Sequence, residues 1–230
     1  MRHIAIAIDG PAAAGKSTIA KIIAKKLNFT YIDTGAMYRA VTLYVLKKGL
    51  DPKDEAASVS LIPEINIILD SSNRVFLNDE DVTNDIRSRI VADNVSYIAS
   101  YKDIRLFLVD QQRKMATMAS VVMDGRDIGS YVLPDAEVKL FQIASVETRA
   151  KRRFDENMEK GIACTYEEVE NELKKRDYID SHRDFAPLTK ASDAIEVDTS
   201  LLTIDEVVEK MLSIINERIG DNLWVYLQYV

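Results

Sequence analysis

A short segment near the start of the chain, residues 10–17 (GPAAAGKS), constrains the fold more than any other feature. It fits the pattern G-x-x-x-x-G-K-[ST], in which backbone N–H groups curl around phosphate oxygens and the lysine side chain reaches further phosphates. An apolar run at residues 4–8 precedes it, and residues 16–27 follow with apolar side chains at helical spacing. A buried strand, a phosphate loop and a helix in this order predict an α/β fold whose first helix points its N-terminus at the phosphate.

Every residue of this phosphate loop is a candidate ligand for a nucleoside triphosphate. Lys16 is expected to contact the β- and γ-phosphates, and the Ser17 hydroxyl to coordinate Mg²⁺. The pattern alone arises by chance in roughly one chain of this length in a hundred, but the flanking strand and helix are the context that the motif requires. The predicted nucleotide-binding residues are Gly10, Pro11, Ala12, Ala13, Ala14, Gly15, Lys16, Ser17 and Thr18.

A phosphate loop does not by itself name a reaction. A GTP-driven switch usually reads guanine with the string Asn-Lys-x-Asp late in the chain, and that string is absent from this sequence. An ATPase that performs mechanical work is a second class, and 230 residues is short for one. A kinase of a small acceptor is the class that these observations favour.

The rest of the chain alternates apolar β-type runs with helical periodicity, which predicts a parallel sheet covered by helices on both faces. Two short β-type runs at residues 65–69 and 74–77, with a turn at 71–73, predict a small antiparallel insertion. The further expected strands are residues 31–33, 120–123, 138–143 and 194–197, and the further expected helices are residues 34–48, 87–99, 102–118, 146–160, 167–180 and 204–219.

Composition narrows the possible partners and the compartment. The net charge of −7 argues against a general nucleic-acid binder, because that affinity comes mainly from basic residues that neutralise phosphates. Cys164 is the only cysteine, so no internal disulfide is possible, which fits a reducing cytoplasm. The apolar run at residues 4–8 is too short for a signal-peptide core, and no stretch is long enough to span a membrane.

Three arginines in the expected helix at residues 146–160 stand at i, i+3 and i+4. Arg149, Arg152 and Arg153 would therefore share one helical face. One interpretation is an anion clamp that closes over a triphosphate, since phosphoryl transfer depends on neutralising charge on the moving group. The alternative is a solvated, charged helix face.

The next expected helix carries a second charged row. Arg176, Asp180 and Arg183 stand at i, i+4 and i+7 and so lie on one face. Spacing alone leaves a surface ion-pair ladder, which contributes little to stability, as a serious alternative to a ligand-binding role.

Two polar segments follow expected strands at the same edge of the sheet, where ligands of open α/β sheets bind. Residues 124–129 (DGRDIG) come after one strand, and residues 33–39 (DTGAMYR) come after another. The first is also compatible with a simple polar turn. The second is also compatible with a helix N-terminus capped by Thr34, and capping does not exclude a ligand contact.

Taken together, the phosphate loop, both polar segments and the row from Arg176 to residues 186–188 (APL) resemble bacterial cytidylate kinase. The resemblance runs in order from about residue 4 to about residue 219. It implies an adenylate-kinase-like fold with a five-stranded parallel core and a mobile lid. It also implies one catalytic unit over residues 1–222, with a monophosphate-binding part at about 34–112 that carries the antiparallel insertion, and the lid at about 148–165.

The resemblance further implies a monomeric enzyme that uses ATP and Mg²⁺ to phosphorylate CMP, with dCMP also accepted. Carried over position by position, Arg39 and Arg126 would grip the CMP phosphate, and Tyr38 would lie in the substrate site. The residues implied around the cytosine are Thr34, Ser96, Arg105 and Asp127; those implied for sugar and phosphate are Arg176, Asp180 and Arg183; the lid set is Arg149, Arg152 and Arg153; and the catalytic set is Lys16, Arg126, Arg152 and Arg183.

The sequence departs from the family pattern in two places. Thr34 stands where many members have serine, and both residues offer a hydroxyl. The apolar segment 223–230 (LWVYLQYV) has no counterpart, and it could cover the core, contact a partner or be a non-native appendage. The functional alternatives are a related kinase acting on UMP or another small acceptor, and a nucleotide-dependent binding switch.

Overall fold

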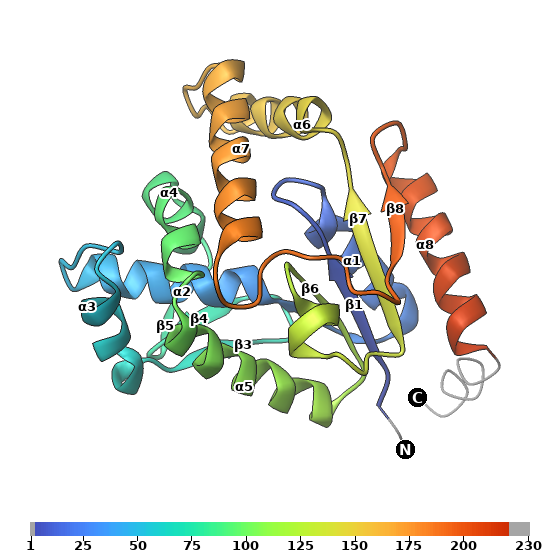
Figure 1. Ribbon diagram of the computed structural model, residues 1–230, viewed down its shortest axis with the longest axis horizontal. Coiled ribbons are helices and arrows are strands. Elements are labelled where there is room, and N and C mark those ends of the chain that lie inside the picture. Colours follow the sequence, from blue (N-terminus) through green and yellow to red (C-terminus); the bar gives the residue numbers. More distant parts are fainter. Residues whose placement is uncertain (1–2, 221–230) are drawn as a thin grey trace.

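A five-stranded parallel sheet forms the centre of the molecule, and its strand order is β2-β6-β1-β7-β8 (Figure 1). The computed structural model describes residues 3–220, so the apolar segment 223–230 lies outside the described residues. The strands are β1 (Ala5–Asp9), β2 (Thr30–Asp33), β6 (Val121–Gly125), β7 (Val138–Ile143) and β8 (Ile195–Asp198). The strand that leads into the phosphate loop, β1, lies in the middle, which places that loop at the centre of the sheet edge.

Helices cover both faces of this sheet, as the alternating sequence pattern predicts. On one face, α1 (Lys16–Leu27) and α8 (Ile204–Ile219) pack against Ile6 and Ile8 of β1. On the other face, Ala7 packs with residues of α5 (Lys102–Met118) and of the short helical turn η3 (Ile128–Val132). Both faces of β1 are therefore buried, which explains its unbroken apolar run.

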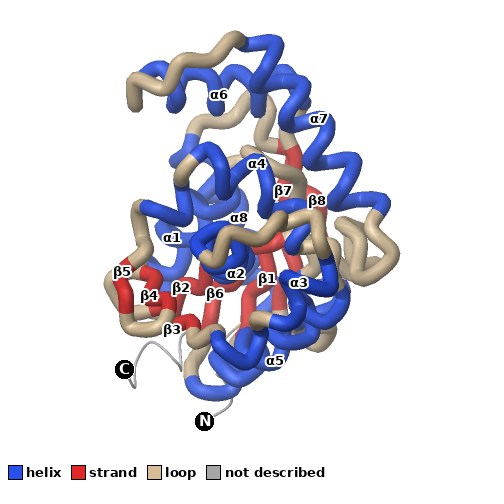
Figure 2. The backbone as a smooth tube through the Cα atoms, turned by 90° about the vertical axis from the view of Figure 1, so that its left-hand side faces the viewer, coloured by secondary structure: helices blue, strands red, loops and turns tan. Residues whose placement is uncertain are grey.

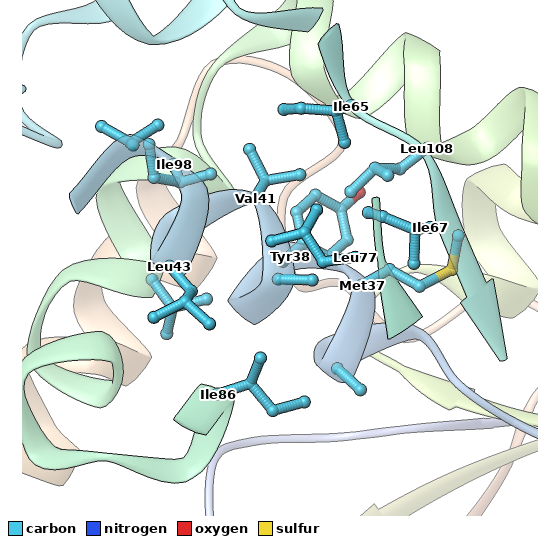
Figure 3. Packing of buried hydrophobic residues seen from close by; sticks show 14 of the residues in the cluster. Met37, Tyr38, Val41, Leu43, Ile65, Ile67, Leu77, Ile86, Ile98 and Leu108 are labelled. Atoms are coloured by element: carbon cyan, nitrogen blue, oxygen red, sulfur yellow. The ribbon is translucent and has the colours of Figure 1, made fainter. Parts of the chain in front are cut away.

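A second core lies beside the sheet, around α2 (Thr34–Lys47). There Met37, Tyr38 and Val41 of α2 point toward side chains of a small antiparallel sheet and of neighbouring helices (Figure 3). The predicted antiparallel insertion is confirmed, although its third strand and the helix α3 were not predicted. The elements of this part are α3 (Glu55–Ser60), η1 (Ile62–Glu64), β3 (Ile67–Leu69), β4 (Val75–Leu77), β5 (Glu80–Asp81), η2 (Asp85–Arg87) and α4 (Arg89–Ile98).

Two helices stand beyond the carboxyl ends of the strands, at the top of Figures 1 and 2. They are α6 (Val146–Glu159) and α7 (Tyr166–His182), and α7 begins with a capping box formed by Thr165 and Glu168. Ala150 of α6 and Leu173 of α7 pack with Ala12 of the phosphate loop in a small separate core. The helix pair therefore touches the nucleotide loop directly. Within residues 3–220, no helix is long and apolar enough to cross a membrane.

Candidate active site

The backbone of the phosphate loop turns sharply at two glycines, and one of its N–H groups, that of Ala12, donates to Asp177 Oδ1 at 3.1 Å. Gly10 has φ +149°, and a Cβ at this position would lie 2.0 Å from the backbone oxygen of Gln142, so only glycine fits. Gly15 precedes α1 with φ 89° and offers no side-chain cap. No side chain of the N-cap residue therefore binds the first N–H groups of α1, and a phosphate suits this N-terminus of the helix.

The Lys16 side chain lies across this loop and is buried. Its Nζ donates hydrogen bonds to the backbone oxygens of Gly10 at 2.8 Å and Pro11 at 2.7 Å. Burial, followed by the positive charge of Arg126, lowers the pKa of Lys16 to about 7. A nearby phosphate would offset both effects and favour the charged ammonium.

The hydroxyl of Ser17 meets a carboxylate from the neighbouring strand. Ser17 Oγ donates to Asp124 Oδ2 at 2.9 Å, and the Tyr31 hydroxyl donates to Asp124 Oδ1 at 2.7 Å. Burial and the negative charge of Asp33 raise the pKa of Asp124. A cation beside Asp124 would relieve this electrostatic cost.

Ser17 and Asp124 fit a magnesium ion that keeps most of its ligands from water and nucleotide phosphates. Hydroxyl and carboxylate oxygens are hard ligands, and Mg²⁺ is commonly held by one or two protein groups beside a triphosphate. Within residues 3–220, no group of three or more His, Cys, Asp or Glu side chains could hold a metal ion without such help. Asp124 had no predicted role, although an acidic residue at the carboxyl end of a strand next to a phosphate-loop strand is a signal for one.

A buried cluster lies around Asp127, two residues beyond the end of β6. Arg105 Nη2 donates to Asp127 Oδ2, and Arg183 Nη2 donates to Asp127 Oδ1 at 3.3 Å. The oxygen of Ala99 accepts a hydrogen bond from Arg105 Nη1 at 3.0 Å. The guanidinium also lies over the Tyr38 ring, 5.3 Å from its centroid. These residues come from four distant segments of the sequence, and the fold brings them together.

Two buried polar atoms of this cluster have no hydrogen-bond partner among the described residues. They are Arg105 Nε and the Tyr38 hydroxyl. Because an unpaired buried polar group costs free energy, these atoms are positions where a bound molecule would be favoured. Ser96, also predicted to lie near the acceptor base, is buried on α4.

A second group of arginines lies close enough for their charges to act on one another. Asp180 is buried and accepts a hydrogen bond from Arg126 Nε at 2.9 Å, and Arg183 is buried too, so these two residues do not belong to a surface ladder. Burial and then the charge of Arg126 lower the pKa of Arg176 to about 10, and Arg153 and Arg39 act in the same direction. Arg126 and Arg176 lie beside the Asp180 carboxylate, and guanidinium groups gathered in this way suit a phosphate.

Arg39 is held by a carboxylate at the end of β2. Its Nη2 contacts both oxygens of Asp33, at 3.2 and 3.1 Å, and Arg87 approaches the same carboxylate at 3.4 Å. Asp33 also accepts a hydrogen bond from Ala36 N at 2.8 Å and is therefore the cap of α2. The prediction that Thr34 caps this helix is wrong, because the Thr34 hydroxyl instead donates to the backbone oxygen of Asp124 at 2.7 Å.

The three arginines of α6 have different environments and different partners. Arg149 is buried and donates to Ala12 O at 2.9 Å and to Asp177 Oδ2 at 2.6 Å. Arg152 Nη2 donates to Thr199 O at 2.7 Å, whereas Arg153 pairs with Glu156 on its own helix. Helical spacing predicted a shared face, but the partners of Arg149 and Arg152 include groups from distant segments of the chain, whereas Arg153 pairs within its own helix.

The fold, with its phosphate loop after the central strand β1 and a group of arginines at the same edge of the sheet, is that of a P-loop kinase. Residues 6–217 match the family model described as cytidylate kinase. The chain belongs to the cytidylate kinase family.

Individual relatives agree with this assignment over nearly the whole chain. A cytidylate kinase of Geobacillus sp. (strain WCH70) is 55% identical over 221 residues, which cover 95% of this chain and 99% of the relative. A cytidylate kinase of Leuconostoc mesenteroides is 52% identical over 223 residues, covering 96% and 100%. A crystal structure of an uncharacterized protein from Eubacterium ventriosum is similar in fold, with a TM-score of 0.53 at 17% identity, covering 94% of this chain and 99% of that one.

Proposed function

We propose that the enzyme transfers the γ-phosphate of ATP to CMP, giving ADP and CDP, and that it also accepts dCMP. The observation that carries this proposal is the buried Asp127 between Arg105 and Arg183, one residue from Arg126 and next to the strand of the phosphate loop. A carboxylate and a guanidinium together suit the edge of a cytosine, and a neighbouring arginine suits its phosphate.

The base is read by complementary donors and acceptors. Cytosine offers an amino donor at N4 and an acceptor at N3, whereas uracil has a carbonyl at C4 and an N–H at N3. A carboxylate only accepts hydrogen bonds and a guanidinium only donates them. Asp127 therefore accepts from N4, and the unpartnered Nε of Arg105 is available to donate to the base. Uracil would place like groups against each other and leave buried polar atoms unpaired.

Further residues complete the acceptor site in this proposal. Arg39 and Arg126 bind the CMP phosphate, which replaces Asp33 as the partner of Arg39. Arg176 and Asp180 of α7, together with Arg183 directly after it, hold the sugar and phosphate, while Thr34, Tyr38 and Ser96 border the base.

The transfer itself needs positioning and charge neutralisation rather than a covalent intermediate. An oxygen of the CMP phosphate attacks the γ-phosphorus in line, and the phosphate is already ionised, so no general base is required. Lys16, Arg126, Arg152 and Arg183 offset the negative charge of the transferring group. Ser17 and Asp124 would hold Mg²⁺, which would supply positive charge to offset that of the nucleotide phosphates.

The ATP side comprises residues 10–18 and the arginines of α6. Arg149 and Arg153 are proposed to contact the nucleotide after exchanging their protein partners, and the lid at about 148–165 is proposed to move with them. The single unit over 1–222, the monophosphate part at about 34–112, a monomeric state and a cytoplasmic location stay predictions from the sequence.

An acceptor screen tests this function. ADP formation is measured with ATP and Mg²⁺ against CMP, dCMP, UMP and AMP in turn, and CMP and dCMP are expected to give the highest kcat/KM. Preference for UMP would favour the alternative kinase. Slow hydrolysis that CMP does not change would favour a nucleotide-dependent switch and contradict the proposal.

A further inference from the structure

Asp9 is a buried carboxylate to which no role has been assigned. It is the last residue of β1, directly before the phosphate loop, and its exposed fraction is 5%. Its Oδ1 accepts a hydrogen bond from Ile128 N at 2.8 Å, and its Oδ2 accepts one from Gly129 N at 2.7 Å. Both oxygens are therefore used to hold the main chain of a segment that lies far away in the sequence.

This segment is the one that carries two acceptor-site residues. The parallel ladder between β1 and β6 ends where Asp9 pairs with Gly125. Arg126 and Asp127 follow, and the next two N–H groups are those that Asp9 binds. The span of Arg126 and Asp127 is thus fixed on one side by the sheet and on the other side by the Asp9 carboxylate.

We propose that Asp9 is a positioning residue that holds residues 125–129 in place, so that acceptor affinity and the selection of cytosine depend on it without any contact to the nucleotide. This inference rests on the proposed function, because it assigns Arg126 and Asp127 to the acceptor. It also links the two substrate sites, because Asp9 directly precedes the phosphate loop and its carboxylate binds the segment 125–129, which carries the acceptor-site residues. A purely structural role predicts lower stability without a selective loss of acceptor binding.

The variant Asp9→Asn separates these interpretations. Asparagine keeps the size of the side chain and one acceptor oxygen, but its amide group places N–H donors against one of the two backbone N–H groups. We expect the Kd for CMP to rise about tenfold, the order set by one lost charge-assisted hydrogen bond. The CMP-to-UMP ratio of kcat/KM should fall by a similar factor, while the Kd for ATP should change less than about twofold because the backbone of the phosphate loop keeps its other contacts.

Glu137→Gln is a matched control. Glu137 Oε2 accepts a hydrogen bond from Ala5 N at 2.8 Å, so it is also a carboxylate that binds a backbone N–H of the β1 region, but at the opposite end of the strand. This variant should leave CMP affinity and acceptor selectivity unchanged.

The measurements are calorimetric titrations of CMP and ATP and steady-state rates with CMP and UMP, on wild type and both variants. A selective loss for CMP in Asp9→Asn supports the proposal. Equal losses for CMP and ATP, or unchanged binding with only a lower melting temperature, would overturn it. If the wild type neither binds nor phosphorylates CMP, the proposed function has failed instead, and the two failures are thereby distinguished.

Hydrogen exchange on the wild type keeps the proposal testable if Asp9→Asn does not fold. The amides of Ile128 and Gly129 should be protected as strongly as the ladder amides of β6, and CMP should protect them further. Exchange as rapid as that of an exposed loop would overturn the proposal.

Discussion

Removal of the Asp127 carboxylate should change both stability and acceptor choice, and the structure sets the size of each effect. The side chain of Asp127 is 5% exposed, and those of its partners Arg105 and Arg183 are 1% and 2% exposed. Asp127→Ala would leave two buried guanidinium groups without the carboxylate that accepts hydrogen bonds from both of them. Removing one partner of a buried pair typically costs about 3–5 kcal/mol, so the free energy of unfolding should fall by about this amount.

The effect on catalysis follows from the hydrogen bond to cytosine N4. A hydrogen bond to a charged group contributes about 1.5–3 kcal/mol, which corresponds to a loss of about 10- to 150-fold in kcat/KM for CMP. UMP presents a carbonyl at that position and should lose less than about threefold. The CMP-to-UMP ratio should therefore collapse by about one to two orders of magnitude, which is part of the discrimination of about 10⁴ or more that sites built on such hydrogen bonds reach.

The assay is ADP formation with CMP and UMP under identical Mg²⁺ and salt, at a temperature where urea unfolding shows both proteins to be folded. Asp193→Ala is the matched control, because Asp193 pairs with the buried Lys139 at 2.8 Å, outside the proposed acceptor site. It should lower stability less and leave the ratio unchanged. If Asp127→Ala lowers both activities equally, Asp127 has only a structural role and cytosine is read elsewhere.

Four further outcomes follow from the site. At pH 8, ATP binding should take up about one proton, because the pKa of Lys16 is about 7 in the free chain and nearby phosphates raise it. Binding heats that do not depend on the ionisation enthalpy of the buffer would contradict this. Lys16→Met should abolish both the proton uptake and turnover. Arg152→Met should lower kcat more than it raises the KM for CMP. Normal kinetics with a lower melting temperature would mean that Arg152 only stabilises the loop after β8, where it binds Thr199 O. Asp124→Asn should raise the Mg²⁺ concentration for half-maximal rate by about tenfold, and an unchanged Mg²⁺ dependence would remove Asp124 from the metal site. Gly10→Ala should lower the free energy of unfolding by about 2 kcal/mol or more, because its Cβ would collide with Gln142, and an unchanged urea midpoint would contradict this.

The sequence by itself determined the helices that have a clear apolar periodicity. The predicted helices at residues 16–27, 102–118 and 204–219 match α1, α5 and α8 at both ends. Each carries apolar residues at helical spacing over three or more turns, which is a signal that does not depend on the rest of the chain. The six residues of α3 and the two residues of β5 were missed, because such short elements contain too few periods to be recognised.

The residue types of the site were also readable, because each type has few possible uses. Gly10 through Ser17 allow an anion-binding turn and little else in their context, and the two polar segments after strands predicted ligand contacts. The cap of α2 shows the limit of this reasoning. Asp33 and Thr34 are both residue types that cap helices well. Asp33 is the cap because its carboxylate lies next to Ala36 N, whereas the Thr34 hydroxyl donates to the backbone oxygen of Asp124.

Only the tertiary structure decided which charged groups are partners. A guanidinium on a long, flexible side chain can reach several neighbours, so the spacing of Arg149 and Arg152 specified a helical face but not a contact. The pairing of Asp9 with the N–H groups of Ile128 and Gly129 joins residues 119 and 120 positions apart. No local pattern encodes such contacts, because they exist only after the strands assemble in the order β2-β6-β1-β7-β8 and packing brings distant segments to one edge of the sheet.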